Sequence, residues 1–203
     1  MRAARVARVL DDPAEANPSR PECVYTREPG ESDALPVNCL SWQRARAFCK
    51  KVGKRLPSET EYEYAAGARA SRAFPWGTDL PACADAVHGG VACTERTTPV
   101  IAGMGARDRV LLGGGEVVDL AGNLRELVAD RFRRGDEACW GDGVFVDPVC
   151  EPAPPDTVVV RSVRGGAYRD DGTLLRAALR TSIADERFAV SELVGFRCAR
   201  DAR

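Results

Sequence analysis

The chain has 203 residues, of which 44% are hydrophobic and 29% are charged; this balance is typical of globular proteins and excludes a disordered or fibrous chain. Lys and Arg number 29 against 30 Asp and Glu, so the net charge is too small to attract nucleic acid or an anionic membrane. No apolar run approaches the ~18 residues that a membrane-spanning helix needs, and we expect no membrane insertion by this chain.

Two short helices are predicted in the first third of the chain. Residues 1–35 are polar and rich in Pro, Arg and Glu, so we expect a loosely structured N-terminal segment. Ser41 can cap a helix whose apolar residues recur at helical spacing and which ends at Gly53. A second helix begins at the capping box formed by Ser58 and Glu61.

The rest of the chain predicts few regular elements. Residues 74–77 break the second helical region into loops, which run without clear periodicity to about Val117 and include a flexible glycine turn at 113–115. Short strands are expected at 158–163 and 194–199. The predicted fold class is therefore α+β, with irregular structure dominant.

Eight cysteines are the most unusual feature of the composition. None forms a Cys-x-x-Cys pair, which structural zinc and redox sites favour, so their spacing suggests disulfides that close loops. Three such bonds are suggested: Cys23–Cys39, Cys83–Cys93 and Cys139–Cys150. Cys49 and Cys198 remain, and would join an early helix to the last strand.

Disulfides imply an oxidising compartment, so we expect an extracytoplasmic location. The alternative is eight reduced cysteines in a cytosolic protein, which is unusual for so many paired positions. Residues 1–5 lead into no apolar signal core, so an export signal is not visible in this chain.

Six sequence blocks occur in an order that resembles a known family. The blocks are PVNCLSW at 36–42, GKRLPSETEYEYAA at 53–66, PWG at 75–77, DLAGN at 119–123, VRGGAY at 163–168 and VGFRC at 194–198. Together they resemble the formylglycine-generating enzyme family, also called sulfatase-modifying factor domains. The resemblance implies a C-type-lectin-like fold over residues 36–203, preceded by the segment 1–35, and a disulfide between Cys49 and Cys198.

The resemblance also implies which residues stand at the catalytic positions. Active members of the family oxidise a sulfatase cysteine to formylglycine with two cysteines that bind Cu(I), a soft ion suited to thiolates. In this sequence the two positions fall on Asp170 and Leu175, and the serine of the preceding turn falls on Ala167. A carboxylate is a hard ligand and leucine has no ligand atom, so we expect no catalytic residue and no bound copper.

A structural calcium site is implied by the block around Asp119. The Asp119 and Glu126 side chains and the carbonyls of Gly122 and Leu124 match the family's pattern, and hard oxygen ligands are those that Ca²⁺ prefers. The alternative is that the two carboxylates cap and solvate a turn.

Other candidate residues suggest at most a ligand-binding surface. His88 lies in a loop, where we expect it to face solvent, and as the only histidine it makes a hydrolase triad improbable. Arg164, Arg176 and Arg180 could line the former active-site cleft together with Asp170 and bind an anionic ligand or peptide.

The expected function is that of a catalytically degenerate, extracytoplasmic binding or accessory module. Its expected partner is a protein or peptide ligand, or other domains of a larger protein. The alternative function is a protein-modifying oxidase that converts a sulfatase cysteine to formylglycine at an unconventional site. The two hypotheses are distinguished by the missing cysteine pair at Asp170 and Leu175.

Overall fold

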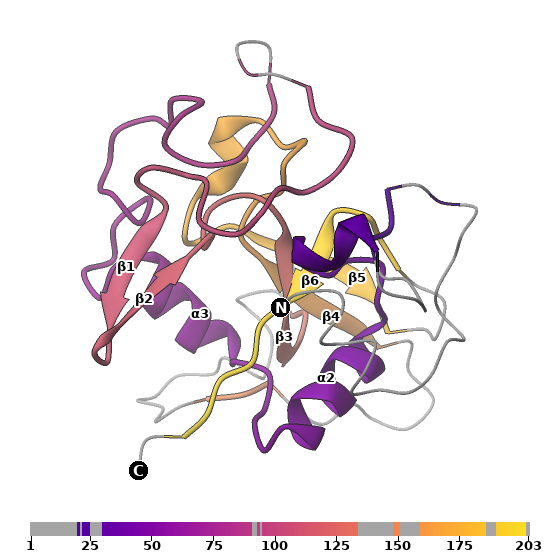
Figure 1. The fold of residues 1–203 in the computed structure, drawn as a ribbon. Coiled ribbons are helices and arrows are strands. Elements are labelled where there is room, and N and C mark those ends of the chain that lie inside the picture. Colours follow the sequence, from indigo (N-terminus) through magenta and orange to yellow (C-terminus); the bar gives the residue numbers. More distant parts are fainter. Residues whose placement is uncertain are drawn as a thin grey trace.

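Short helices and two small β-sheets make up the regular structure of the computed structural model (Figure 1). The structure describes residues 20, 22–24, 30–90, 93, 95–133, 148–150, 159–185 and 190–201. Its elements in chain order are η1 (Glu31–Ala34), α2 (Trp42–Lys51), α3 (Glu59–Ala66), β1 (Arg109–Leu112), β2 (Gly115–Val118), β3 (Arg125–Arg131), β4 (Val160–Arg164), η3 (Gly172–Leu175), β5 (Arg180–Ala184) and β6 (Val194–Phe196). The fold is α+β with long loops, as predicted.

Both predicted helices are present, and their N-termini differ. In α3, Ser58 Oγ accepts the Glu61 amide at 3.1 Å while Glu61 Oε2 accepts the Ser58 amide at 2.7 Å, which confirms the capping box. Ser41 occupies the N-cap position of α2, but its side chain makes no capping hydrogen bond. Beyond α2, Gly53 adopts a φ of +69°, a conformation that glycine reaches without strain.

Four strands form the main sheet in the order β5-β4-β3-β6, with β3 antiparallel to β4 and parallel to β6. The strands predicted at 158–163 and 194–199 correspond to β4 and β6. Strand β3 was not predicted because nearly every one of its residues is buried, so its sequence lacks the alternation of a half-exposed strand.

The glycine turn predicted at 113–115 joins the hairpin of β1 and β2. Leu112 pairs with Gly115, which leaves Gly113 and Gly114 as a two-residue turn with φ angles of +55° and +82°. Positive φ at both positions is typical of the type I′ turns that match strand twist, and explains why glycine stands at both.

Helix α2 covers the main sheet and forms the largest part of the core. Phe48 packs edge-to-face on Phe196 of β6, with ring centroids 5.5 Å apart. Trp42 is buried in the same cluster, and its indole nitrogen donates to the Val128 carbonyl of β3 at 2.8 Å. Helix α2 therefore packs directly on β3, the strand that follows the 119–123 block.

Disulfides join loops and elements that are distant in sequence. The pairs Cys23–Cys39, Cys49–Cys198 and Cys83–Cys93 are all formed, which confirms three of the four expected bonds. Cys150 is also disulfide-bonded, whereas its predicted partner Cys139 lies outside the described residues.

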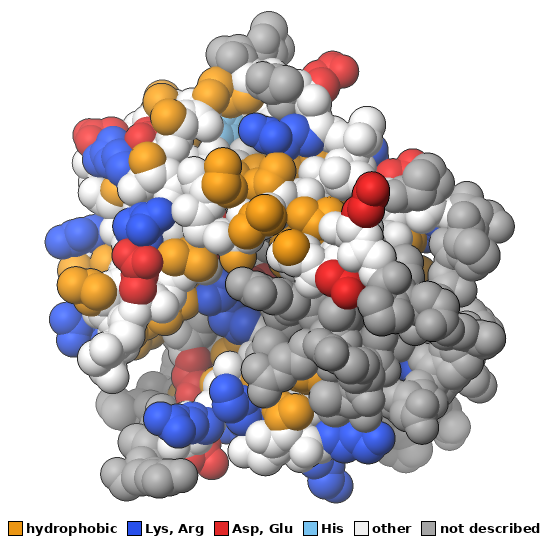
Figure 2. All heavy atoms as spheres, viewed as in Figure 1, with side chains coloured by type: hydrophobic (Ala, Val, Ile, Leu, Met, Phe, Trp, Pro, Cys, Tyr) orange, Lys and Arg blue, Asp and Glu red, His pale blue; other side chains and the backbone are white. Residues whose placement is uncertain are grey.

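The surface carries charges of both signs. On the face drawn in Figure 2, Lys and Arg side chains and Asp and Glu side chains are both present, and hydrophobic side chains gather in its upper part. The net charge of -1 reflects similar numbers of the two signs in the sequence. Among the described residues, the helices are all too short or too polar to cross a bilayer.

Candidate functional site

Asp170, which we expect at the first of the family's two catalytic positions, is a buried carboxylate that is fully engaged. Arg125 of β3 donates from Nε to Asp170 Oδ2 at 2.8 Å and from its second nitrogen to Oδ1. The Ala167 amide donates to Oδ2 at 2.7 Å. Only 6% of Asp170 is exposed. The carboxylate therefore accepts hydrogen bonds from its own loop and from β3 and is largely shielded from solvent.

The second position, Leu175, belongs to the hydrophobic core. Its side chain is 0% exposed and packs with Phe74, Ala86 and Ala121. A Cβ placed on Gly166 would lie 2.2 Å from Leu175 Cδ2, so the leucine fills the space directly above the Gly-Gly turn. The two positions thus hold an ion pair and a packed apolar side chain.

The Gly-Gly turn lies directly against the 119–123 block. The Gly166 amide donates to the Ala121 carbonyl at 2.8 Å, and the Tyr168 amide donates to the Asn123 carbonyl at 2.9 Å. Gly165 has a φ of +76°, and a Cβ there would lie 2.6 Å from the Tyr62 hydroxyl. Two of the sequence blocks therefore form one interlocked site, in which larger residues at these glycines would not fit.

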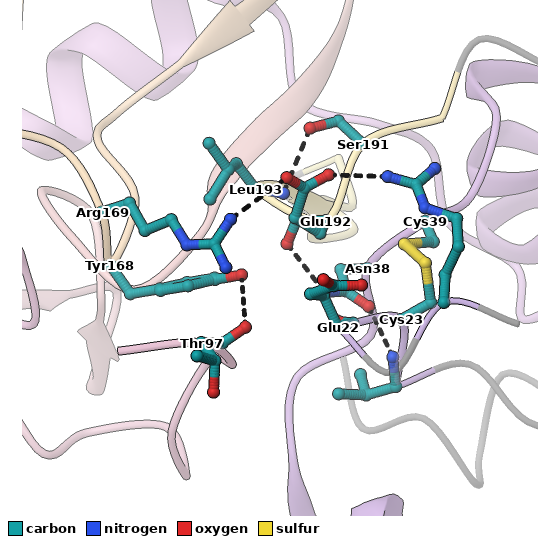
Figure 3. The surroundings of a disulfide bond; sticks show 12 residues. Glu22, Cys23, Asn38, Cys39, Thr97, Tyr168, Arg169, Ser191, Glu192 and Leu193 are labelled. Atoms are coloured by element: carbon teal, nitrogen blue, oxygen red, sulfur yellow. Dashed lines mark hydrogen bonds and ion pairs between the residues drawn. A yellow bond between two sulfur atoms is a disulfide. The ribbon is translucent and has the colours of Figure 1, made fainter. Parts of the chain in front are cut away.

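The N-terminal segment contacts the same loop through Glu192 (Figure 3). Arg20 donates to Glu192 Oε2 at 2.8 Å, and Arg169 donates to Glu192 Oε1 at 3.4 Å. Asn38, beside the Cys23–Cys39 disulfide, donates to the Glu22 and Glu192 carbonyls at 2.8 and 2.7 Å. One carboxylate thus links the N-terminal segment to the residue that precedes Asp170.

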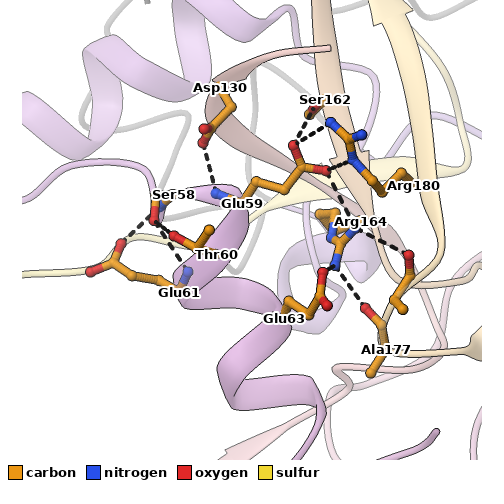
Figure 4. A network of polar contacts seen from close by, with 11 residues as sticks. Ser58, Glu59, Thr60, Glu61, Glu63, Asp130, Ser162, Arg164, Ala177 and Arg180 are labelled. Carbon is orange, nitrogen blue, oxygen red and sulfur yellow. Dashed lines mark hydrogen bonds and ion pairs between the residues drawn. The ribbon is translucent and has the colours of Figure 1, made fainter. Parts of the chain in front are cut away.

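The expected anion-binding cluster of Arg164, Arg176, Arg180 and Asp170 is not formed, because carboxylates already bind Arg164 and Arg180 (Figure 4). Arg180 and Arg164 both donate to Glu59, from Arg180 Nη2 at 3.0 Å and Arg164 Nη1 at 3.3 Å.

Ser162 also donates to Glu59, at 3.0 Å, and Arg164 is fully buried with further bonds to Glu63 and the Ala177 carbonyl. Arg176 lies over the Phe74 ring at 5.8 Å. The buried carboxylate of Glu59 and the exposed carboxylate of Glu63, both on α3, therefore neutralise Arg164 of β4 and Arg180 of β5.

Three of the four predicted calcium-binding residues line one pocket. Asp119, Leu124 and Glu126 line a cavity of about 370 Å³ together with Asn123 and Arg197. Asp119 Oδ2 accepts the Gly103 amide at 2.9 Å, and burial raises the pKa of Asp119, with the Glu126 charge adding to the effect.

A cation from the chain itself lies on part of this set. Arg197 forms a bidentate ion pair with Glu126 and also donates to the Val118 and Asp119 carbonyls at 3.0 Å. The Gly122 carbonyl accepts the Leu124 amide at 3.0 Å. The oxygens fit Ca²⁺ in chemical type, and Asp119 is the carboxylate of the set that has no ion pair with Arg197 in the described structure.

Asp108 was missed by the sequence analysis, although it shapes the 119–123 block. Its two carboxylate oxygens accept the amides of Leu120, Ala121 and Gly122 at 2.9 to 3.0 Å. Burial raises the pKa of Asp108 to about 6, against the opposing effect of the three amides. No motif precedes it in the sequence, so only the fold reveals this role.

His88 was predicted to face solvent, and this prediction is wrong. It is 6% exposed and lies against the Cys83–Cys93 disulfide, with Cys93 Sγ 3.6 Å from Nε2. The loop is held to the Asp170 region by the Gly89 amide, which donates to the Asp170 carbonyl at 2.8 Å. The ten-residue disulfide loop folds its only histidine inward because that loop packs on the 165–175 segment.

The chain is similar to curated proteins that are named as formylglycine-generating enzymes, one of them as inactive. It is 31% identical over 188 residues to a formylglycine-generating enzyme of Streptomyces coelicolor, covering 82% of this chain and 53% of that protein. It is 28% identical over 187 residues to the inactive Cα-formylglycine-generating enzyme 2 of Bos taurus, covering 83% and 51%.

A serine/threonine-protein kinase Pkn1 of Chlamydia trachomatis is 30% identical over 177 residues, covering 87% of this chain and 26% of the kinase. The chain thus spans about half the length of the two formylglycine-generating-enzyme relatives and a smaller share of the kinase.

Two solved structures share the fold. Treponema denticola variable protein 1 superposes with a TM-score of 0.69 at 18% identity, covering 97% of this chain and 80% of that chain. PvdO from Pseudomonas aeruginosa superposes with a TM-score of 0.61 at 23% identity, covering 87% and 66%.

The model of one domain family matches nearly the whole sequence. The sulfatase-modifying factor enzyme 1-like domain matches residues 9–202, a range that includes all six sequence blocks. The chain belongs to the sulfatase-modifying factor (formylglycine-generating enzyme) family.

Proposed function

We propose that this chain is a non-catalytic member of the family and acts as an extracytoplasmic binding or accessory module. The observation that carries the proposal is the pair of replacements at the catalytic positions. Asp170 is neutralised by Arg125, and Leu175 is packed in the core. Neither side chain supplies the soft thiolate that Cu(I) requires, and the space around them is filled by protein atoms.

The names of the relatives are compatible both with a non-catalytic member of the family and with an active oxidase. One relative carries the word inactive in its name, whereas others are named as formylglycine-generating enzymes. The alternative function is therefore an oxidase of the same family. It would need a thiol pair elsewhere in the molecule, and none of the described cysteines is free.

The disulfides support an extracytoplasmic location, because bonds of this number persist in oxidising compartments. We infer that the partner is a protein or peptide, or further domains of a larger protein. The similarity to a kinase of which this domain covers only 26% provides a precedent for the second arrangement.

We also propose a structural Ca²⁺ held by Asp119 and the carbonyls of Gly122 and Leu124. Glu126 would join the set only by exchanging its ion pair with Arg197 for the ion. Calcium would supply no chemistry for a reaction here. It would neutralise a buried carboxylate and stabilise the 119–126 segment against which the Gly-Gly turn packs.

A competition for Cu(I) tests the non-catalytic assignment. The chain and the Streptomyces coelicolor enzyme are each titrated against a chromophoric Cu(I) chelator in ascorbate, a mild reductant that keeps copper monovalent. We expect the enzyme to remove copper from the chelator and this chain to leave it bound. Removal of one Cu(I) per chain, with all disulfides intact by mass spectrometry, would contradict the proposal.

A further inference from the structure

Three potential metal ligands converge outside the site described above. The Cys83–Cys93 disulfide closes a loop of ten residues around His88. The two sulfurs and a ring nitrogen of His88 all lie within 4.8 Å of one another. Cys93 Sγ is 3.6 Å from His88 Nε2. Sulfur and nitrogen ligands at ~2.3 and ~2.1 Å from a tetrahedral zinc ion are also about 3.6 Å apart.

Both ring nitrogens of His88 lie near a backbone carbonyl, and the contact at Nδ1 is the shorter one. His88 Nδ1 lies 2.7 Å from the Gly89 carbonyl and Nε2 lies 3.4 Å from the Ala82 carbonyl. A neutral ring carries one proton, so the shorter contact assigns it to Nδ1 and leaves the lone pair on Nε2. Cys93 Sγ lies 3.6 Å from Nε2 and 3.7 Å from Nδ1. In a metal-binding histidine, the ring nitrogen that does not bind the metal usually donates a hydrogen bond to a carboxylate, a backbone carbonyl or water.

This disulfide is also the most accessible of those described. Cys83 is exposed and Cys93 is partly exposed, whereas in the other two bonds Cys23, Cys39 and Cys49 are buried and Cys198 is partly exposed. The bond lines a pocket of about 370 Å³, beside Pro81, Asp171 and Thr173. A small reductant therefore reaches Cys83 before it reaches the sulfurs in the core.

We propose that Cys83, His88 and Cys93 form a redox-gated Zn²⁺ site. A dithiol reduces the disulfide by exchange: its two thiols become a disulfide, and two electrons and two protons pass to Cys83 and Cys93. Zn²⁺ then binds both sulfurs and His88 Nε2 and releases the two thiol protons. Three protein ligands leave the fourth tetrahedral position open toward the pocket. When the disulfide is formed, neither Cys83 nor Cys93 is a thiolate, and the protein does not bind zinc at this site.

The experiment compares zinc binding by the oxidised and the mildly reduced protein. The folded chain is treated with limiting dithiothreitol under argon and desalted, and the free thiols are alkylated in one portion and mapped by mass spectrometry. Another portion is titrated with Zn²⁺ against a chromophoric chelator, and a third with Co²⁺. We expect alkylation at Cys83 and Cys93 first, one zinc per reduced chain, and sulfur-to-cobalt charge-transfer absorption. Reduction of Cys49–Cys198 first, or equal zinc binding by the oxidised protein, would overturn the proposal.

Two variants distinguish zinc binding by these three ligands from a general effect of reduction. His88→Gln keeps the disulfide and should lower the zinc affinity of the reduced protein at least ~10-fold, since even the loss of an outer contact has an effect of 10–100-fold. The Cys83→Ser/Cys93→Ser variant should lose zinc binding while keeping the other disulfides. Unchanged zinc affinity in His88→Gln, with its fold confirmed by circular dichroism, would exclude the histidine as a ligand and overturn the proposed site.

Discussion

Arg125 Nε lies 2.8 Å from Asp170 Oδ2, so an ion pair joins strand β3 to the loop that contains Asp170 and Leu175. This contact places a positive charge beside the residue that we expect at the family's first catalytic position. Because both partners are at least partly buried, the pair links β3 and this loop within the structure.

The Arg125–Asp170 pair should stabilise the fold measurably. Asp170→Ala leaves the arginine without its carboxylate, and we expect a loss of about 2 kcal/mol in the free energy of unfolding, less than for a fully buried pair because Arg125 is partly exposed. A double-mutant cycle with Arg125→Ala, followed by urea denaturation, should give a coupling energy of about 1–3 kcal/mol. Strict additivity of the two single changes would show that the pair contributes nothing.

Leu175 and its neighbour Leu174 form a matched test of the second position. Leu175→Ala should reduce the free energy of unfolding by about 2–5 kcal/mol, because it opens a cavity next to the Gly-Gly turn. Leu174 is 37% exposed, so Leu174→Ala should have an effect of under ~1 kcal/mol. Equal effects in chemical denaturation would contradict the core role of Leu175.

Calcium binding should appear as a change in melting temperature. At a 100-fold excess over its Kd, Ca²⁺ would add about 2.7 kcal/mol, a rise of roughly 5–10 °C for a domain of this size. Asp119→Asn should abolish the rise, and it is a cleaner change than one at Glu126, which also binds Arg197. Asp79→Asn, on an exposed carboxylate of another loop, is the control that should retain the rise. No shift in the wild-type protein would remove the calcium proposal.

Asp130 should make stability depend on pH below neutrality. Burial raises the pKa of Asp130, although the amides of Cys150 and Glu59 oppose the shift by donating to it. A raised pKa means that the folded protein binds this proton more tightly than the unfolded chain. This contribution to the free energy of unfolding is therefore greatest below pH ~3.9 and falls as the pH rises through the folded pKa.

Asp130→Asn removes this titration and should make the fall shallower over the same range of pH. The measurement is urea denaturation of both proteins at several pH values between 3 and 8. An unchanged pH slope in the variant would assign the dependence to other groups.

Local sequence signals predicted the elements that are specified locally. The capping box of Ser58 and Glu61 and the glycine turn at Gly113 and Gly114 depend on neighbouring residues, and both are present in the structure. Strands β3 and β5 depend on their partners across the sheet, and their residues show no clean alternation. They could be assigned only once the sheet order was known.

The contacts of the candidate site could not be predicted from the sequence. The family resemblance assigns Asp170 and Leu175 to the catalytic positions, but the partner Arg125 is 45 residues from Asp170 in sequence. Glu59 likewise binds Arg180 over a separation of 121 residues. Because Arg180 is already paired with this carboxylate, it does not form the expected anion site. Single-sequence reasoning carries no information on such pairings, since each charge also has candidate partners nearby.

The proposed absence of oxidase activity is tested most directly on a substrate peptide. The chain, with its disulfides intact, is incubated with copper, oxygen, a reductant and a cysteine-containing sulfatase peptide, beside the Streptomyces coelicolor enzyme as a positive control. Mass spectrometry then follows the peptide's cysteine. Our account predicts that the control converts the cysteine to formylglycine and that this chain leaves it unchanged, because Asp170 and Leu175 supply no thiolate. Formylglycine produced by this chain at a rate above the protein-free background would contradict it.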